Sequence, residues 1–271
     1  MPRAQQTDPT RGKPLTLAAL RELSALDDIA PPTGDFDPNG PWKHTYQIWL
    51  VGRKASGFLR LERTPAPDGK SATLNVEMSV AQMARTALQT NAQLDCAADP
   101  LASPRSWKIE SVLLDAEGRP IELSRVNESA TVKNGTIEVK AGDKTLTRTV
   151  PSPFTTNWSL FDAVQRLSGK DAKPLEFALL EDLDLVKENQ RLSYWQDAQI
   201  ELGGKTIALH GYQQIGAGIL PYQYWVDDQH RLLFAISGVR AYILDPKAPE
   251  RMGQNPKAPA KAGKGKKKKK K

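Results

Sequence analysis

Apolar and polar residues alternate along most of this chain, in short runs separated by turns that contain Gly, Pro, Asn or Asp. Residues 74–80, LNVEMSV, alternate strictly, as in a strand with one buried face. Asn134-Gly135 lies between two alternating runs, which is typical of a two-residue β-hairpin turn. Repeated short strands at this spacing predict an antiparallel sheet and not a series of β–α–β units.

The most apolar stretch, residues 218–244, is expected to form the centre of the core. Its runs 222–226 and 231–237 flank a polar turn and predict a hairpin, with a further strand after Gly238. Residues 81–94 favour a helix by propensity but also fit a strand, and both interpretations stay open. Other strands are expected at 44–51, 58–63, 74–80, 107–114, 121–126, 130–132, 136–140, 145–150, 175–186, 192–195, 198–202 and 206–212.

Two segments have helical periodicity instead. Between Thr16, which suits an N-cap, and a pair of prolines, five apolar residues recur at helical spacing up to Ile29. A second apolar stripe begins at Trp158 and ends before a glycine, with Asn157 or Ser159 as its cap. Such a stripe is more often core than a cofactor site, so we expect this helix to plug or cover the sheet.

The fold class predicted is mainly β (α+β), with one large curved antiparallel sheet or half-barrel built from hairpins and covered by one or two helices. No apolar run reaches the roughly 18 residues of a transmembrane helix. We expect a disordered N-terminus at 1–14, an amphipathic helix with a Pro/Gly connector at 15–41, a single β-rich domain at 42–245, and a disordered Lys-rich tail at 246–271.

Charge is distributed unevenly along the 271 residues. The formal charge of +7 divides into +10 for residues 247–271 and −3 for residues 1–246, so any affinity for polyanions rests on the tail. The tail has no aromatic residue that would stack on bases, and anionic polymer, lipid or nucleic acid would all serve as its partner. The candidate polyanion-binding residues are Lys264, Lys266, Lys267, Lys268, Lys269, Lys270 and Lys271.

The start of the chain gives one indication of location. Pro2-Arg3-Ala4 followed by Gln5-Gln6 suits the end of a signal-peptidase recognition site and the start of a mature protein. We therefore expect a periplasmic or secreted protein if a leader was removed, and a cytoplasmic one otherwise. The single cysteine, Cys96, excludes an intrachain disulfide.

Motifs of enzymes are missing from the sequence: no phosphate loop, Gly-rich nucleotide fingerprint, paired metal-binding histidines or Gly-x-Ser-x-Gly elbow is present. His44, His210 and His230 are far apart and suit surface or core roles. Cys96 would need a base and an electropositive setting to act as a nucleophile. Three carboxylates at 181–184 lack calcium-loop spacing. We predict no cofactor and no metal, and a non-enzymatic role is favoured over a hydrolase.

Aromatic residues gather in the C-terminal half and suggest a ligand site. On a strongly curved sheet, their inward-facing members would line an apolar cavity for a small molecule or lipid, although they would equally fill a core. The candidates are Trp195, Tyr212, Tyr222, Tyr224, Trp225 and Phe234.

The order of these elements resembles a group of bacterial envelope proteins of unknown function that contain a long curved antiparallel sheet. The resemblance covers roughly Trp107 to Leu244, and the wider architecture is similar to the half-barrel of periplasmic lipoprotein carriers of the LolA type. In that group the last hairpin carries an aromatic residue, an acidic turn, Arg and Leu, here Trp225, Asp227, Asp228, Arg231 and Leu232. The resemblance implies no catalytic residue, and the Lys-rich tail departs from it.

Two functions of different classes follow. The first is an extracytoplasmic, non-enzymatic binding or scaffold protein that holds an apolar ligand in its sheet, with the tail on anionic polymer or lipid. The second is a cytoplasmic protein associated with nucleic acid through the tail.

Overall fold

The computed structural model describes residues 15–22, 26, 28–51, 53–82 and 86–251, and one 15-stranded, largely antiparallel sheet dominates them. Its strands lie in the spatial order β8-β7-β6-β5-β4-β3-β2-β1-β15-β14-β13-β12-β11-β10-β9. They are β1 Trp42–Leu50, β2 Arg53–Pro65, β3 Ser71–Ala81, β4 Ala87–Ala97, β5 Pro104–Leu114, β6 Val126–Lys133, β7 Thr136–Ala141, β8 Lys144–Thr149, β9 Phe154–Thr156, β10 Leu175–Glu181, β11 Leu185–Leu202, β12 Lys205–Gly216, β13 Tyr222–Val226, β14 Leu232–Ser237 and β15 Arg240–Leu244. The predicted mainly β fold is therefore confirmed.

Local sequence explains why these strands form. In β3 the alternating apolar residues are buried and the polar residues between them are more exposed, as the period of two requires. Asn134 and Gly135 join β6 to β7 with φ of +52° and +75°, a conformation that Asn and Gly adopt more readily than other residues. The hairpin expected within 218–244 and the strand that follows it are present as β13, β14 and β15.

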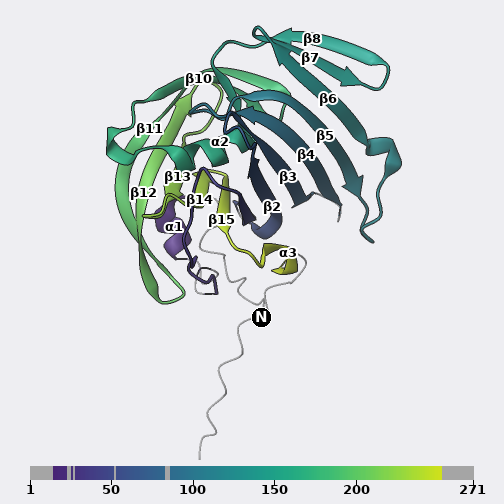
Figure 1. Ribbon diagram of the computed structural model, residues 1–271. Coiled ribbons are helices and arrows are strands. Elements are labelled where there is room, and N and C mark those ends of the chain that lie inside the picture. Colours follow the sequence, from purple (N-terminus) through teal and green to yellow (C-terminus); the bar gives the residue numbers. More distant parts are fainter. Residues whose placement is uncertain (1–14, 23–25, 27, 52, 83–85, 252–271) are drawn as a thin grey trace, which may run out of the picture.

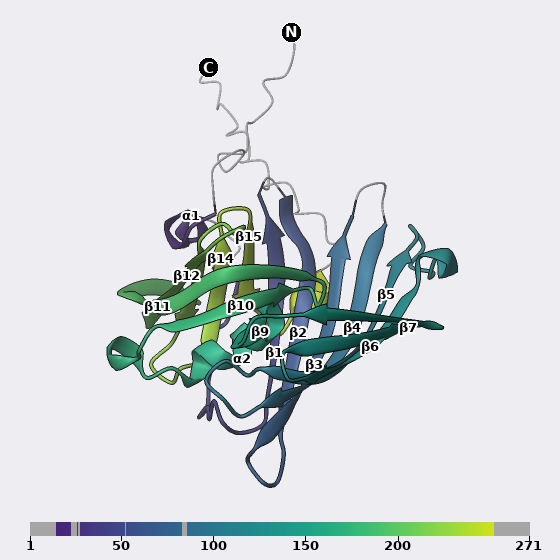
Figure 2. The same cartoon turned by 90° about the horizontal axis from the view of Figure 1, so that it is seen from above.

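The order of the strands places the first strand of the chain, β1, beside the last, β15. β1 to β8 step outward in one direction, β9 begins at the opposite edge, and β10 to β15 return until β15 pairs with β1. All neighbours are antiparallel except β9 and β10. The sheet curves so strongly that its two walls face each other (Figures 1 and 2). Arg148 on β8 forms an ion pair of 3.0 Å with Asp184, which follows β10.

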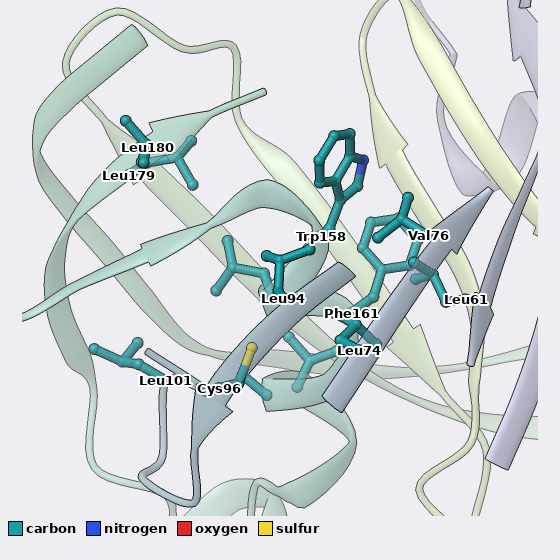
Figure 3. Close-up of a cluster of buried hydrophobic side chains, with 14 of the residues drawn as sticks. Leu61, Leu74, Val76, Leu94, Cys96, Leu101, Trp158, Phe161, Leu179 and Leu180 are labelled. Carbon is teal, nitrogen blue, oxygen red and sulfur yellow. The ribbon is translucent and has the colours of Figure 1, made fainter. Parts of the chain in front are cut away.

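Helix α2, Asn157–Ala163, lies inside this curve and carries the centre of the main core (Figure 2). Its cap is Thr156, whose Oγ1 accepts a 2.9 Å hydrogen bond from the Ser159 amide, so the predicted caps Asn157 and Ser159 were one and three residues too late. Trp158 and Phe161 are almost fully buried (Figure 3). The expectation that this segment is core and fills the sheet is confirmed.

A buried ion pair fixes α2 to the wall. Asp162 lies 3.0 Å from the guanidinium nitrogens of both Arg63 on β2 and Arg166, which is one turn further along the chain. Burial alone raises the pKa of Asp162, whereas the two arginines oppose that rise. Loss of Asp162 would leave both arginines without their carboxylate in a largely buried setting, which makes the position of α2 strongly dependent on this residue.

A second apolar cluster lies on the outer face of the sheet. Helix α1, Leu17–Arg21, is capped by Thr16 as predicted, but it is only five residues long. Leu20 of α1 belongs to the same buried cluster as Trp225 and Phe234. The remaining helical elements are η3 Glu122–Ser124, η4 Val164–Arg166, η5 Gly169–Asp171 and α3 Ala248–Arg251. The sheet is thus covered on both faces, by α2 on the inside and by α1 with its connector on the outside.

Several strand boundaries differ from the prediction. The strand expected at 121–126 is the short helix η3, and β6 begins only at its end. The expected strand 175–186 is divided by a turn at Asp182 and Leu183, which have φ of +49° and +61°. Of the two interpretations of 81–94, the strand is the one found, because β4 pairs with β3 and β5 along its length.

Candidate functional site

Strand register builds one wall of the candidate site. Two rows of directly paired residues cross β12, β13, β14, β15 and β1 on the inner face of the sheet. The outer of these rows, here called the rim row, consists of Gln214, Tyr222, Ser237, Arg240 and Leu50. The next, here called the inner row, consists of Tyr212, Tyr224, Ala235, Tyr242 and Ile48.

A cavity of about 460 Å³ lies between these rows and α2. All five residues of the rim row line it, together with Tyr224 and Tyr242 of the inner row. The volume is within the range of about 300–1,000 Å³ that is usual for small-molecule sites. The other lining residues are Asn157, Trp158, Phe161, Leu179, Glu181, Asp182, Lys187, Gly218, Ile219, Leu220 and Val239.

Aromatic rings form much of the lining. Phe161 of α2 makes edge-to-face contacts with Tyr224 and Tyr242, at ring-centre distances of 6.2 and 5.2 Å. Tyr222 stacks on Tyr224 at 5.2 Å. Burial raises the pKa of all three tyrosines, so their hydroxyls stay protonated at neutral pH. The cavity therefore combines apolar ring faces with neutral hydroxyl groups.

Side-chain amides hold one end of the rim row in place. The Tyr224 hydroxyl donates to Gln214 Oε1 at 3.0 Å, and Gln214 Nε2 donates to Gln190 Oε1 at 3.2 Å. Gln190 in turn donates through Nε2 to the carbonyl of Ala217 at 3.0 Å. Both glutamines are nearly fully buried. This chain of hydrogen bonds fixes the β12–β13 connection against the cavity.

Charged groups around the cavity differ in their pairing. Lys187 lies 2.6 Å from Glu181, and the carboxylate of Asp182 accepts a 2.8 Å hydrogen bond from Asn157. Arg240 is half-buried and donates to the Tyr242 hydroxyl at 3.2 Å. Among the described residues, no carboxylate lies within ion-pair distance of Arg240.

The mouth of the cavity is apolar. Leu220, in the β12–β13 connection, and Val239, in the β14–β15 turn, line it with 52% and 54% of their surface exposed. Single exposed apolar side chains are common on protein surfaces, so these two matter here only because both border the cavity.

The structure divides the six predicted aromatic residues between two faces. Tyr222 and Tyr224 line the cavity, as the interpretation of a curved sheet requires. Tyr212 faces the same side but is fully buried, and its hydroxyl accepts from the Gly169 amide at 2.9 Å and donates to the Leu167 carbonyl at 3.3 Å. It therefore fastens η5 to the wall and does not line the cavity.

The other three predicted residues lie away from the cavity. Trp225 and Phe234 alternate with the lining residues along β13 and β14, so their side chains enter the outer cluster beneath α1. The Trp225 ring covers Gly211, where a Cβ would come within 2.7 Å of it. Trp195 is 40% exposed and packs at 5.5 Å on Trp225. A ligand-binding role for these three stays a prediction.

The environment of Cys96 disfavours a nucleophilic role. It is 2% exposed, and its Sγ lies 3.7 Å from the Ser159 hydroxyl (Figure 3). Burial raises its pKa to about 12, so the thiolate needed for attack is not formed at neutral pH.

The three histidines occupy separate environments. His44 is buried, with Nε2 3.2 Å from Oε1 of Gln165 in η4, and burial lowers its pKa to about 4. His210, a partly exposed residue of β12, lies between Asp197 and Asp228, at 2.8 and 3.2 Å. His230 occupies the β13–β14 turn with φ of +65°.

The remaining expectations concern metal binding, membrane-spanning helices and the two terminal segments. Within the described ranges, no group of three or more His, Cys, Asp or Glu side chains could hold a metal ion, including the carboxylates at 181–184. None of the described helices combines the length and apolar character needed to span a membrane. The tail lysines, Lys264 and Lys266 to Lys271, lie outside the described residues, as do residues 1–14.

Comparison with known proteins shows similarity of structure only. No protein-family model matches the sequence, and no curated protein matches it. The chain is similar to a beta-barrel-like protein of domain of unknown function DUF1849 from Brucella abortus, with 10% identity and a TM-score of 0.48 over 76% of this chain and 95% of that one. It is also similar to a DUF1089 family protein from Pseudomonas aeruginosa, with 12% identity and a TM-score of 0.34 over 76% and 94% of the two chains. The envelope location and the LolA-type half-barrel stay predictions.

Sequence reasoning missed several lining residues, notably Phe161 and Arg240. Phe161 belongs to the apolar stripe that predicts the second helix, and nothing in that stripe indicates which of its residues meet a cavity. Arg240 and Tyr242 are two residues apart on one strand, as are Tyr222 and Tyr224, which is the signal of a shared face. That signal becomes specific only when the pairing of β13, β14 and β15 is known.

Proposed function

We propose that this protein is a non-enzymatic binding protein that holds an apolar small molecule or a lipid in the cavity between α2 and the rim row. The observation that carries the proposal is the tyrosine-lined cavity itself, whose volume of about 460 Å³ is combined with an apolar mouth. The ring faces supply contact area to the ligand, and the fixed hydroxyl and amide groups orient it.

The lining favours binding over catalysis. Neither Cys96 nor His44 lines the cavity, because Cys96 is protonated in the core and His44 packs against Gln165 of η4. The carboxylates that do line it have partners, Lys187 for Glu181 and Asn157 for Asp182. The tyrosines that line the cavity have raised pKa values and hold their protons. A carrier or sensor needs no more than this preformed, partly apolar site.

Two matched variants test the proposal. Leu220→Glu places a carboxylate at the cavity mouth, whereas Ile215→Glu places one at a similarly exposed position on β12 that does not line the cavity. Titration with a neutral, solvent-sensitive dye such as Nile red should show binding that Leu220→Glu weakens about tenfold, which is about 1.4 kcal/mol. Ile215→Glu should leave it unchanged.

Absence of dye binding, or equal loss in both variants, would refute the proposed site. Native mass spectrometry of the protein purified from its own organism gives an independent test. A lipid-sized adduct on the wild-type chain that is lost in Leu220→Glu would support the site, and its retention in that variant would contradict it.

The Lys-rich tail suggests a second binding partner, an anionic polymer or lipid surface. We infer that Lys266 to Lys271 engage an anionic polymer or lipid outside the cytoplasm, because a run of six lysines releases counterions from any dense array of negative charge. A chain truncated after Gly265 should lose its salt-sensitive retention on anionic vesicles and keep the dye affinity. Co-purification of the full chain with nucleic acid instead, together with a cytoplasmic location on fractionation, would favour the second function.

A further inference from the structure

Arg240 distinguishes this cavity from a purely apolar one. Its guanidinium lies in the rim row between Ser237 and Leu50, where the register places it at the cavity wall. Arginine is always charged in proteins, and half-burying it has a desolvation cost that an acidic partner usually offsets. The described part of the chain supplies one neutral acceptor for it, the Tyr242 hydroxyl.

The other charges at the wall do not supply this partner. Glu181 is already paired with Lys187 at 2.6 Å. Asp182 is exposed to solvent and accepts its hydrogen bond from Asn157, so water screens its attraction for Arg240. The guanidinium therefore keeps hydrogen-bond donors that no described side chain uses.

Two hydroxyl groups lie beside this cation. Tyr242 accepts from Arg240, which leaves its own O–H group as a donor. Tyr222 occupies the rim row two strands away, and its hydroxyl makes no hydrogen bond to another described residue. Because burial keeps both phenols protonated, they act as donors and add no negative charge.

Apolar groups surround this cluster of donors. Trp158, Phe161 and Leu179 lie on the α2 side of the cavity, and Leu220 and Val239 lie at its mouth. A ligand that complements both the hydrogen-bond donors and the apolar residues of the cavity has an acidic head group with acceptor oxygens and an apolar chain. Carboxylate and phosphate oxygens match the planar fork of arginine.

We propose that the ligand is a single-chain amphiphile with an anionic acid head group, and that Arg240 is the residue that selects this head group. This inference rests on the proposed function, since it requires the cavity to be the binding site. The chain packs along α2, and the head group accepts hydrogen bonds from Arg240 and the two tyrosine hydroxyls.

The test compares ligands that share a chain and differ in the head group. Isothermal titration with decanoate, methyl decanoate and decyltrimethylammonium on the wild-type protein should give the tightest binding for decanoate, by about tenfold to a hundredfold over the ester. Decyl phosphate, as a second acid, distinguishes a carboxylate-type ligand from a phosphate-type one by which of the two binds more tightly.

Variants then assign the preference to one side chain. Arg240→Gln should abolish the preference for decanoate and leave the affinity for the ester within about twofold. Arg240→Lys, which keeps the charge without the planar fork, should retain part of it. Arg191→Gln, which removes an exposed guanidinium from β11 outside the cavity, should change nothing.

The outcomes separate this inference from the proposed function. Equal binding of acid and ester by the wild-type protein would overturn the role of Arg240 and leave the cavity intact as a site. Binding of neither would overturn both. The acid–ester comparison on the wild-type chain decides the matter even if Arg240→Gln does not fold.

Discussion

Acidification should destabilise this protein through His44, and the size of the effect follows from its surroundings. The ring is 7% exposed, stacks at 4.8 Å on Trp42, and lies 3.2 Å from Gln165 Oε1. Burial, together with the charge of Arg231, lowers its pKa from 6.5 to about 4. The folded protein therefore holds His44 neutral at pH values where the unfolded chain binds a proton.

The sign and magnitude come from proton linkage. Above pH 6.5 neither state protonates His44, and its contribution to stability is fully present. As the pH falls from 6.5 to 4, only the unfolded state gains the proton, so the free energy of unfolding decreases. A difference of two to three pKa units corresponds to about 3 kcal/mol lost by pH 4.

Urea unfolding at pH 7, 5.5 and 4, for the wild type and for His44→Gln, measures this loss. Glutamine keeps a donor for Gln165 and has no proton to gain, so the variant should lose about 3 kcal/mol less than the wild type across this range. Carboxylates contribute equally to both proteins, and the difference between the two isolates His44. Parallel pH profiles would refute the reasoning, as would an NMR titration of the His44 ring with a midpoint near 6.5.

Three further predictions concern residues away from the cavity. Trp225→Ala should reduce the free energy of unfolding by about 3 to 5 kcal/mol in urea titrations, because the ring is 1% exposed. At urea concentrations where the variant stays folded, dye binding should be unchanged. Lost binding would place the ring in the site. Gly211→Ala should reduce the free energy of unfolding by about 1 to 3 kcal/mol in the same assay, since its Cβ would lie 2.7 Å from the Trp225 ring and 2.9 Å from the Gln196 carbonyl oxygen. In a protein that also carries Trp225→Ala, much of that reduction should disappear. Cys96 should react with a thiol reagent such as dithionitrobenzoate only after unfolding, because its pKa is about 12 and it is 2% exposed; fast labelling of the native protein at pH 7 would contradict its burial.

Fold class was predictable here because local signals repeat along the chain. The alternation in β3 and the Asn134-Gly135 turn each indicate antiparallel hairpins without knowledge of the rest of the chain. Boundaries were less predictable where tertiary contacts decide them. The break between β10 and β11 depends on positive φ at Asp182 and Leu183, and leucine gives no sequence signal for that conformation.

The candidate site was predictable only in part, for a geometric reason. A high density of aromatic residues indicates a core or a cavity. The face of the sheet on which each side chain lies, however, depends on strand register. Tyr224 and Trp225 are neighbours in the sequence, yet one lines the cavity and the other packs beneath α1. Arg240 became a candidate only when the pairing of β14 with β15 placed it beside Ser237 and Tyr242.

The pairing of β1 with β15 has a consequence for how the chain folds. Ile48 and Tyr242 face each other although roughly 190 residues separate them, so the middle of the sheet closes last during synthesis. Until β15 is made, β1 presents an unpaired edge that carries Ile48 and Trp49, which is a template for association with other chains. The rim row also stays incomplete until then, so an unfinished chain has neither its central seam nor its cavity.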